Sequence, residues 1–160
     1  MTDGETVAPA PAAEPPAGFD DLTCFALYAA SRAVTGVYRP LLERIGLTYP
    51  QYLVMLWLWR NGDSGVKDIG NALQLDYGTL TPLLKRLEAL GYVRRQRRLD
   101  DERAVQVTLT GAGADLRAQA TDVPDEITRA LGITAAQATA LRELLRTVCA
   151  NTADHAPPRR

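Results

Sequence analysis

The chain has few of the residues that build disulfide frameworks and metal sites. Among its 160 residues are two cysteines, Cys24 and Cys149, and one histidine, His155. Two cysteines are too few for a disulfide framework, and in a reducing compartment both are expected to be thiols. One histidine and two cysteines far apart in the sequence give no spacing suited to zinc. We therefore expect neither a metal nor another cofactor.

Long hydrophobic runs are also missing. No apolar stretch reaches the ~18–20 residues needed to span a bilayer. Residues 1–6 are acidic and lack the apolar segment of a secretory signal. The overall composition, 46% hydrophobic and 23% charged, is that of an ordinary soluble globular protein. These features predict a cytoplasmic protein with no membrane partner.

One amphipathic helix stands out in the middle of the chain. Its leucines fall on a single helical face, at Leu80, Leu83, Leu84, Leu87 and Leu90. Asp76 is the expected N-cap, and Gly91 the residue that ends the helix. Pro82 lies beyond the first turn of a helix that begins at Tyr77, where proline removes a backbone hydrogen bond. The sequence leaves open whether the helix begins nearer Thr79 or bends at Pro82.

A basic hairpin, called here the wing, is predicted directly after this helix. Its strands are expected at 92–98 and 104–109. Seven of the chain's 18 basic residues lie between Lys85 and Arg103, although the formal net charge is −1. Such a local basic patch indicates a nucleic-acid-binding surface. A helix suited to the major groove with a charged hairpin beside it is the layout of a winged helix-turn-helix module.

The remaining pattern is mainly helical. A first helix is expected over about 22–44, Thr48 should cap a second, and residues 66–73 form a short third after a loop at 61–65. Thr110 should cap a long helix that Pro124 kinks or breaks, and Thr134 a last helix with an apolar stripe of Leu141, Leu144, Leu145 and Val148. We expect a disordered Pro/Ala-rich arm at 1–17 and a disordered tail at 153–160. Residues 18–152 would be one domain, with the winged module at about 48–109 and dimerisation helices at about 20–46 and 110–152.

The predicted DNA contacts divide by chemistry. Lys85 and Arg86 suit phosphates, which fix register without reading bases. The start of the helix meets base edges in helix-turn-helix docking. Asp101 could orient Arg103 toward a narrow minor groove. The full set of candidate DNA-binding residues is Tyr77, Gly78, Thr79, Thr81, Pro82, Lys85, Arg86, Arg97, Asp101 and Arg103.

Several motifs resemble those of the MarR family of dimeric bacterial repressors, and in particular its organic-hydroperoxide-sensing OhrR-type members. Asp101-Glu102-Arg103 matches the family's Asp-x-Arg signature in the wing. Further matching segments are 22–28 (LTCFALY), 38–42 (YRPLL), 47–53 (LTYPQYL) and 75–86 (LDYGTLTPLLKR). The resemblance implies a homodimer that binds a pseudo-palindromic double-stranded operator and responds to organic hydroperoxides as oxidants.

Cys24 is the candidate sensor. Its position near a helix N-terminus favours the thiolate, the form that peroxides oxidise. Tyr28 shares its face at i+4, whereas Tyr38 lies ~21 Å along the axis at about 1.5 Å per residue. The resemblance implies that Tyr38 and Tyr49 of the other protomer hydrogen-bond the sulfur. The alternatives are an inert core cysteine and tyrosines that only pack at an interface.

Cys149 departs from the family pattern. Two-cysteine relatives carry the second thiol where this chain has 128–130. We expect Cys149 to be a buried structural thiol, with a resolving thiol as the alternative.

These observations predict a repressor that releases its operator when Cys24 is oxidised. The alternative is a MarR-type repressor released by a small phenolic or lipid-like ligand, with Cys24 merely lining the cleft. A thiol peroxidase is disfavoured, because an enzyme of that kind needs no arginine-rich wing.

Overall fold

A computed structural model of the chain describes residues 18–97 and 105–153. The internal contacts divide the chain between Ala33 and Val34, and each part is described by itself. The first part holds a short 3-10 helix, η1 (Phe19–Asp21), and the beginning of helix α1 (Thr23–Glu43). Helix α1 agrees with the predicted first helix to within a residue at each end, whereas η1 was not predicted.

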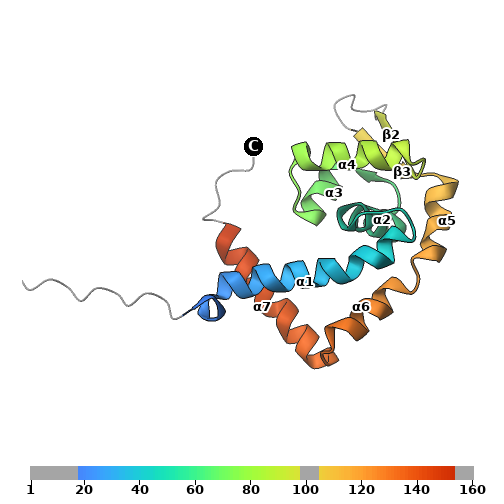
Figure 1. Ribbon diagram of the computed structural model, residues 1–160. Helices are drawn as coiled ribbons and strands as arrows, with labels where there is room; N and C mark the ends of the chain where they lie inside the picture. The colour runs from blue at the N-terminus through green and yellow to red at the C-terminus, as the bar shows by residue number, and fades with distance from the viewer. Residues whose placement is uncertain (1–17, 98–104, 154–160) are drawn as a thin grey trace, which may run out of the picture. The chain divides into compact units, whose positions relative to one another are not determined.

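The second part contains a winged helix-turn-helix, as predicted. Helices α2 (Tyr49–Asn61), α3 (Val66–Leu73) and α4 (Tyr77–Ala89) are followed by strands β2 (Val93–Arg97) and β3 (Val105–Leu109). In Figure 1, α4 lies across α2 and α3, with the hairpin at one end. Strand β1 (Ser64–Gly65) pairs with β3, which gives an antiparallel sheet in the order β1-β3-β2. Residues 61–65 were predicted to be a loop, because two residues are too few to show a strand pattern.

The core of the winged module comes from the apolar faces of its helices and strands. Each large apolar side chain buried here stabilises the fold by roughly 1.5–3 kcal/mol. Leu83 is only partly buried and Leu90 is 49% exposed, so the predicted leucine stripe is narrower than expected. The buried members include Val54, Met55, Leu58, Ile69, Leu80, Leu84, Leu87, Val93 and Val107.

Helix α4 begins at Tyr77, which settles the question about Pro82. The Asp76 carboxylate accepts the Thr79 backbone N–H at 2.7 Å and the Thr79 hydroxyl at 2.9 Å. The hydrogen bond from the Thr79 backbone lowers the pKa of Asp76. Pro82 therefore lies inside the helix, on its exposed side. A strong N-cap compensates for the backbone hydrogen bond that this proline removes.

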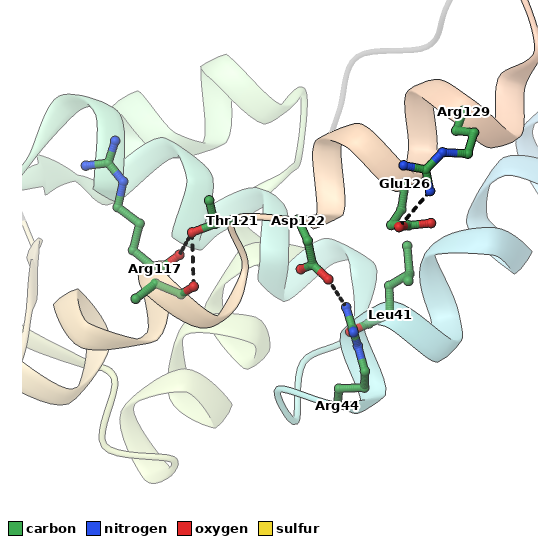
Figure 2. A network of polar contacts seen from close by, with 8 residues as sticks. Leu41, Arg44, Arg117, Thr121, Asp122, Glu126 and Arg129 are labelled. Atoms are coloured by element: carbon green, nitrogen blue, oxygen red, sulfur yellow. Dashed lines mark hydrogen bonds and ion pairs between the residues drawn. The ribbon is translucent and has the colours of Figure 1, made fainter.

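Three helices follow the sheet: α5 (Gly111–Gln119), α6 (Val123–Leu131) and α7 (Ala135–Ala153). The predicted long helix is interrupted between α5 and α6, just before Pro124, as expected. Figure 2 shows the polar contacts at this break. Arg44, after α1, donates to Asp122 at 2.8 Å, and Arg129 pairs with Glu126 at 2.8 Å within α6.

The apolar stripe predicted for the last helix is largely exposed in the single chain. None of the residues of α7, all of which the structure describes, is buried. Leu144 is 66% exposed and Leu141 is 46% exposed. Among the described residues of the second part of the chain, no element buries this face. Within the described parts of the chain, no helix combines the length and apolarity needed to cross a membrane.

The start of α5 lies against the backbone that enters the wing. Thr110 caps α5 by accepting the Gly113 N–H at 3.0 Å, and its own N–H donates to the Tyr92 carbonyl at 3.0 Å. A Cβ atom added at Gly113 would lie 2.0 Å from that carbonyl oxygen. The Trp59 indole N–H also donates to the Gly113 carbonyl at 2.8 Å. Only glycine fits between these groups.

Replacing Gly113 with alanine should therefore destabilise the protein. The new methyl group would force backbone apart, at a cost of about 1–3 kcal/mol or more. Gly111→Ala is the matched control, because nothing lies within 4 Å of its added Cβ. It should stay within about 1 kcal/mol of the parent. Urea unfolding at one fixed protein concentration measures both, and equal stabilities would contradict the close packing at Gly113.

Candidate functional site

The first turns of α4 form one exposed surface. Tyr77 is 66% exposed, and Gly78 and Pro82 are exposed as well. The Thr79 hydroxyl is already bound by Asp76, so toward an external partner it can act only as an acceptor. Thr81 is half-buried. The structure therefore brings the predicted base-reading residues together on one surface. They differ in how exposed they are and in which hydrogen-bonding groups remain available to DNA.

Gly78 was predicted to let the backbone approach DNA closely. The structure gives this position a second, local role. A Cβ at Gly78 would lie 3.1 Å from Oδ1 of Asp76. That oxygen is the acceptor of the helix cap. A side chain at this position would crowd the carboxylate that starts α4.

Basic side chains continue this surface along α4 and into the wing. Lys85 and Arg86 are exposed on α4, and Arg94 and Arg97 are exposed on β2. Arg95 differs, because it forms an ion pair with Glu88 at 2.7 Å and its side chain is only 25% exposed. The sequence alone does not distinguish Arg95 from the other arginines of the wing, because Glu88 lies on the preceding helix. Asp101 and Arg103 lie outside the described residues, so their predicted minor-groove role stays a prediction.

Cys24 lies in the first turn of α1 and is exposed. Aromatic rings follow one another on the same helix and on η1. The ring centroids of Phe19 and Phe25 are 5.4 Å apart, and those of Phe25 and Tyr28 are 6.4 Å apart. Arg32 donates to the Tyr28 hydroxyl at 3.0 Å and lies 5.7 Å from the centre of its ring. Cys24 is thus an accessible thiol on a helix that also carries exposed aromatic rings.

Three tyrosines form a cluster in the second part of the chain. The ring centroid of Tyr38 lies 4.5 Å from that of Tyr49 and 6.0 Å from that of Tyr52. Burial, followed by the neighbouring Tyr49 and Tyr52, raises the pKa of Tyr38 to about 12. Burial also raises the pKa of Tyr49. The cluster therefore offers neutral phenols, which are hydrogen-bond donors.

Cys24, Tyr28, Tyr38 and Tyr49 are predicted from the sequence to form one redox site. Cys24 and Tyr28 belong to the first part of the chain, and Tyr38 and Tyr49 to the second. A site that combines them stays a prediction. Tyr52 is a third member of the tyrosine cluster. From the sequence it was expected only as a core residue, because a spacing of three residues from Tyr49 is common to buried positions of any helix.

Cys149 is exposed on α7, so the expectation of a buried thiol is wrong for the single chain. Its neighbour Val148 is 39% exposed for the same reason, the uncovered face of α7. An open groove beside Cys149 is lined by Arg142, Leu145 and Arg146. The alternative role of Cys149, that of a resolving thiol, stays a prediction.

One cavity of about 460 Å³ lies between α2 and the break from α5 to α6. Tyr52 and Trp59 give it aromatic walls, and Arg60 and Arg117 give it positive charge. Such a lining suits an aromatic or aliphatic carboxylate. Among the residues that the structure describes, no group of three or more His, Cys, Asp or Glu side chains could hold a metal ion.

Comparisons with known proteins agree on one class of protein. A family model described as transcriptional regulator SarA/Rot matches residues 36–119. The organic hydroperoxide resistance transcriptional regulator of Bacillus subtilis (strain 168) is 50% identical over 104 residues, which cover 65% of this chain and 71% of that protein. The regulator TtmR of Methylorubrum extorquens (strain PA1) is 48% identical over 130 residues, 81% of this chain and 67% of the relative.

Solved structures of regulators are similar in fold. AbfR of Staphylococcus epidermidis superposes with a TM-score of 0.69 at 34% identity, over 82% of this chain and 90% of AbfR. Reduced AbfR bound to DNA gives 0.69 at 36% identity, over 78% and 87% of the two chains. BpsR of Bordetella bronchiseptica, whose DNA binding is regulated by 6-hydroxynicotinic acid, gives 0.76 at 25% identity, over 84% and 98%.

The partly buried tyrosine cluster should be visible in an alkaline titration. The ordinary pKa of a tyrosine, 10.0, applies to the unfolded chain, whereas that of Tyr38 is about 12 in the fold. The folded state therefore holds this proton longer, and Tyr38 lowers the free energy of unfolding as the pH rises from 10 toward 12. Tyrosinate absorbance should show a late step that Tyr38→Phe removes. Tyr77→Phe should leave it in place, and a parent without a late step would contradict the cluster.

Proposed function

Because the chain belongs to the MarR family of winged helix-turn-helix transcriptional regulators, in its OhrR-type branch, we propose that it is a repressor that releases its operator when an organic hydroperoxide oxidises Cys24. The observation that carries the proposal is the accessible Cys24 at the start of α1. A regulator 50% identical to this chain is named for organic hydroperoxide resistance.

The DNA-binding surface would be the exposed side of α4 together with the wing. Tyr77, Gly78 and Thr79 would face base edges in the major groove, with Thr81 and Pro82 in the same turns. Lys85, Arg86, Arg94 and Arg97 would bind phosphates. Reduced AbfR, a structural relative, has been solved on DNA. Asp101 and Arg103, which lie outside the described residues, would bind the minor groove as the sequence predicts.

The chain would act as a homodimer on a pseudo-palindromic duplex. The apolar side chains of α7 are too exposed for a stable single chain, and a partner copy would cover them. The first helix and the last two helices would form this interface. Two recognition helices would then meet two half-sites whose spacing the dimer sets.

The oxidation step uses the thiolate of Cys24. Its sulfur attacks the terminal oxygen of the hydroperoxide, and an S–O bond forms as the O–O bond breaks. The alkoxide leaves with the electron pair, takes a proton and departs as an alcohol, while Cys24 becomes a sulfenic acid. The neighbouring aromatic rings would favour organic hydroperoxides over hydrogen peroxide.

Release of DNA would follow from a change at the subunit interface. In the proposed dimer, Tyr38 and Tyr49 of the partner donate hydrogen bonds to the sulfur of Cys24. Oxidation adds an oxygen atom to that packed contact and forces the groups to rearrange. Because the interface sets the spacing of the recognition helices, a small shift there abolishes the fit to two half-sites.

One observation favours the alternative repressor, released by a small ligand. The cavity beside Tyr52 and Trp59 carries two arginines, Arg60 and Arg117, and so suits a phenolic or aliphatic carboxylate. BpsR, a structural relative, responds to such an aromatic acid. DNA release by phenolic acids in a Cys24→Ser protein would favour this alternative over the thiol sensor.

Lys85→Ala should weaken binding to every DNA sequence alike. One phosphate contact would be lost, so the slope of log affinity against log salt should fall by about one unit. Arg129→Ala is the control, because it removes the same charge from α6, away from α4 and the wing. Fluorescence anisotropy on duplex DNA over a salt series measures both. Equal slopes for Lys85→Ala and the parent would show that α4 is misplaced on DNA.

Cys24→Ser should bind DNA as the reduced parent does, yet stay bound when organic hydroperoxide is added. Serine keeps the size of the side chain but has no redox chemistry. Tyr38→Phe should slow release without abolishing it, since only a donor to the thiolate is lost. Anisotropy on duplex DNA before and after cumene hydroperoxide or hydrogen peroxide gives both results.

Cys149→Ser separates the two roles of the second thiol. If release persists in this variant, oxidation of Cys24 is sufficient, and if release is lost, Cys149 is the resolving thiol. Peroxide-driven release of the Cys24→Ser protein would end the sensor proposal.

A further inference from the structure

Glu88 is the only acidic residue of α4, and it binds Arg95 of the wing through both carboxylate oxygens. The Nε and Nη2 atoms of Arg95 donate to Oε2 at 2.8 and 2.7 Å. The backbone N–H of Arg95 donates to Oε1 at 2.9 Å. The two side chains are 25% and 36% exposed, the arginine being the more covered. One carboxylate thus holds both the side chain and the main chain at the middle of β2.

The position of β2 makes this contact more than a surface ion pair. β2 is an edge strand, because the order of the sheet is β1-β3-β2. The N–H of Arg95 points away from β3, and Glu88 satisfies it. The turn between α4 and β2 is fixed as well, by hydrogen bonds from Gly91 to Glu88 at 2.9 Å and from Tyr92 to Leu87 at 3.0 Å. Helix α4 and strand β2 are therefore joined at two places, by the turn and by the Glu88–Arg95 pair.

The surrounding charges show why the pair is needed. Lys85, Arg86, Arg94 and Arg97 surround Glu88 in sequence and are exposed. The hydrogen bond from Arg95 lowers the pKa of Glu88, which therefore stays ionised. An unpaired carboxylate in this cationic surface would repel phosphates. Arg95 neutralises it and is itself no longer free to bind a phosphate.

We propose that the Glu88–Arg95 pair positions the wing against α4 and so sets the discrimination between operator and other DNA. The inference rests on the proposed DNA-binding function. Specific binding requires helix and wing to meet two grooves at once, and a fixed angle removes the cost of ordering them on binding. Non-specific binding depends on the number of phosphates neutralised, which the pair does not change.

The test compares a neutral replacement of the pair with the loss of one neighbouring charge. Glu88→Gln combined with Arg95→Met removes the ion pair and leaves the net charge of the surface unchanged. Arg94→Ala removes one exposed charge from the adjacent strand position. Two probes are used, a duplex selected from a random library by the parent protein and a mixed-sequence duplex of equal length.

The double variant should lose roughly fivefold in affinity for the selected duplex, within the coupling range of neighbouring groups. Its affinity for the mixed duplex and its salt slope should match the parent. Arg94→Ala should weaken both probes alike and lower the slope by about 0.9. Arg95→Lys keeps the charge but cannot donate from two nitrogen atoms to Glu88. It should therefore also discriminate less between the two duplexes, while its slope of log affinity against log salt stays unchanged. If urea unfolding shows that the double variant is not folded, the comparison of Arg95→Lys with the parent replaces it.

Two results would overturn the inference. A double variant or Arg95→Lys that discriminates as well as the parent would show that the pair does not position the wing. A salt slope lowered by about one unit in the double variant would place Arg95 on a phosphate. A parent that binds neither probe would instead overturn the proposed function, and the inference with it.

Discussion

The contact of Gly113 with the carbonyl of Tyr92 is the constraint on which the winged module depends. It lets α5 begin directly beneath the wing, with Thr110 bound to Tyr92 on one side and Trp59 of α2 bound to Gly113 on the other. The hydroxyl of Thr110 also donates to the Gly91 carbonyl at 2.6 Å. The base of the wing, the second helix and the helix that leaves the module therefore meet at one residue without a side chain. Close packing of this kind transmits a displacement instead of absorbing it.

Local chemistry made most of the winged module predictable from the sequence. The caps at Thr48, Asp76, Thr110 and Thr134, and the proline at position 124, mark helix boundaries through side-chain and backbone geometry that any chain shares. The family resemblance, carried by residues such as those of 75–86, is confirmed by relatives at up to 50% identity. What the sequence did not show depends on contacts between distant residues. The two-residue β1 exists only because β3 pairs with it, and Arg95 differs from Arg94 only because Glu88 faces it.

The candidate sites were predictable to different degrees. The exposed start of α4 follows from helix periodicity, so Tyr77 and Gly78 lie where expected. Burial of α7 and of Cys149 was expected from an apolar stripe. Such a stripe indicates that a helix face is covered, but it does not indicate whether the same chain or a partner copy covers it. The roles of Cys24, Tyr38 and Tyr49 remain predictions, since each depends on contacts between two copies. Burial, followed by the neighbouring Tyr49 and Tyr52, raises the pKa of Tyr38, and no spacing rule identifies that environment.

The uncovered α7 also bears on how long the protein lasts in a cell. A 19-residue helix with no buried side chain is marginal in water by itself. In the proposed dimer its order depends on meeting a partner, so the open population grows as the protein is diluted. Proteases act on open segments. A newly made chain would then be the most vulnerable one, and turnover would be faster when the regulator is scarce than when it is abundant. The cellular concentration of the protein would in this way depend partly on the exposed apolar face of α7.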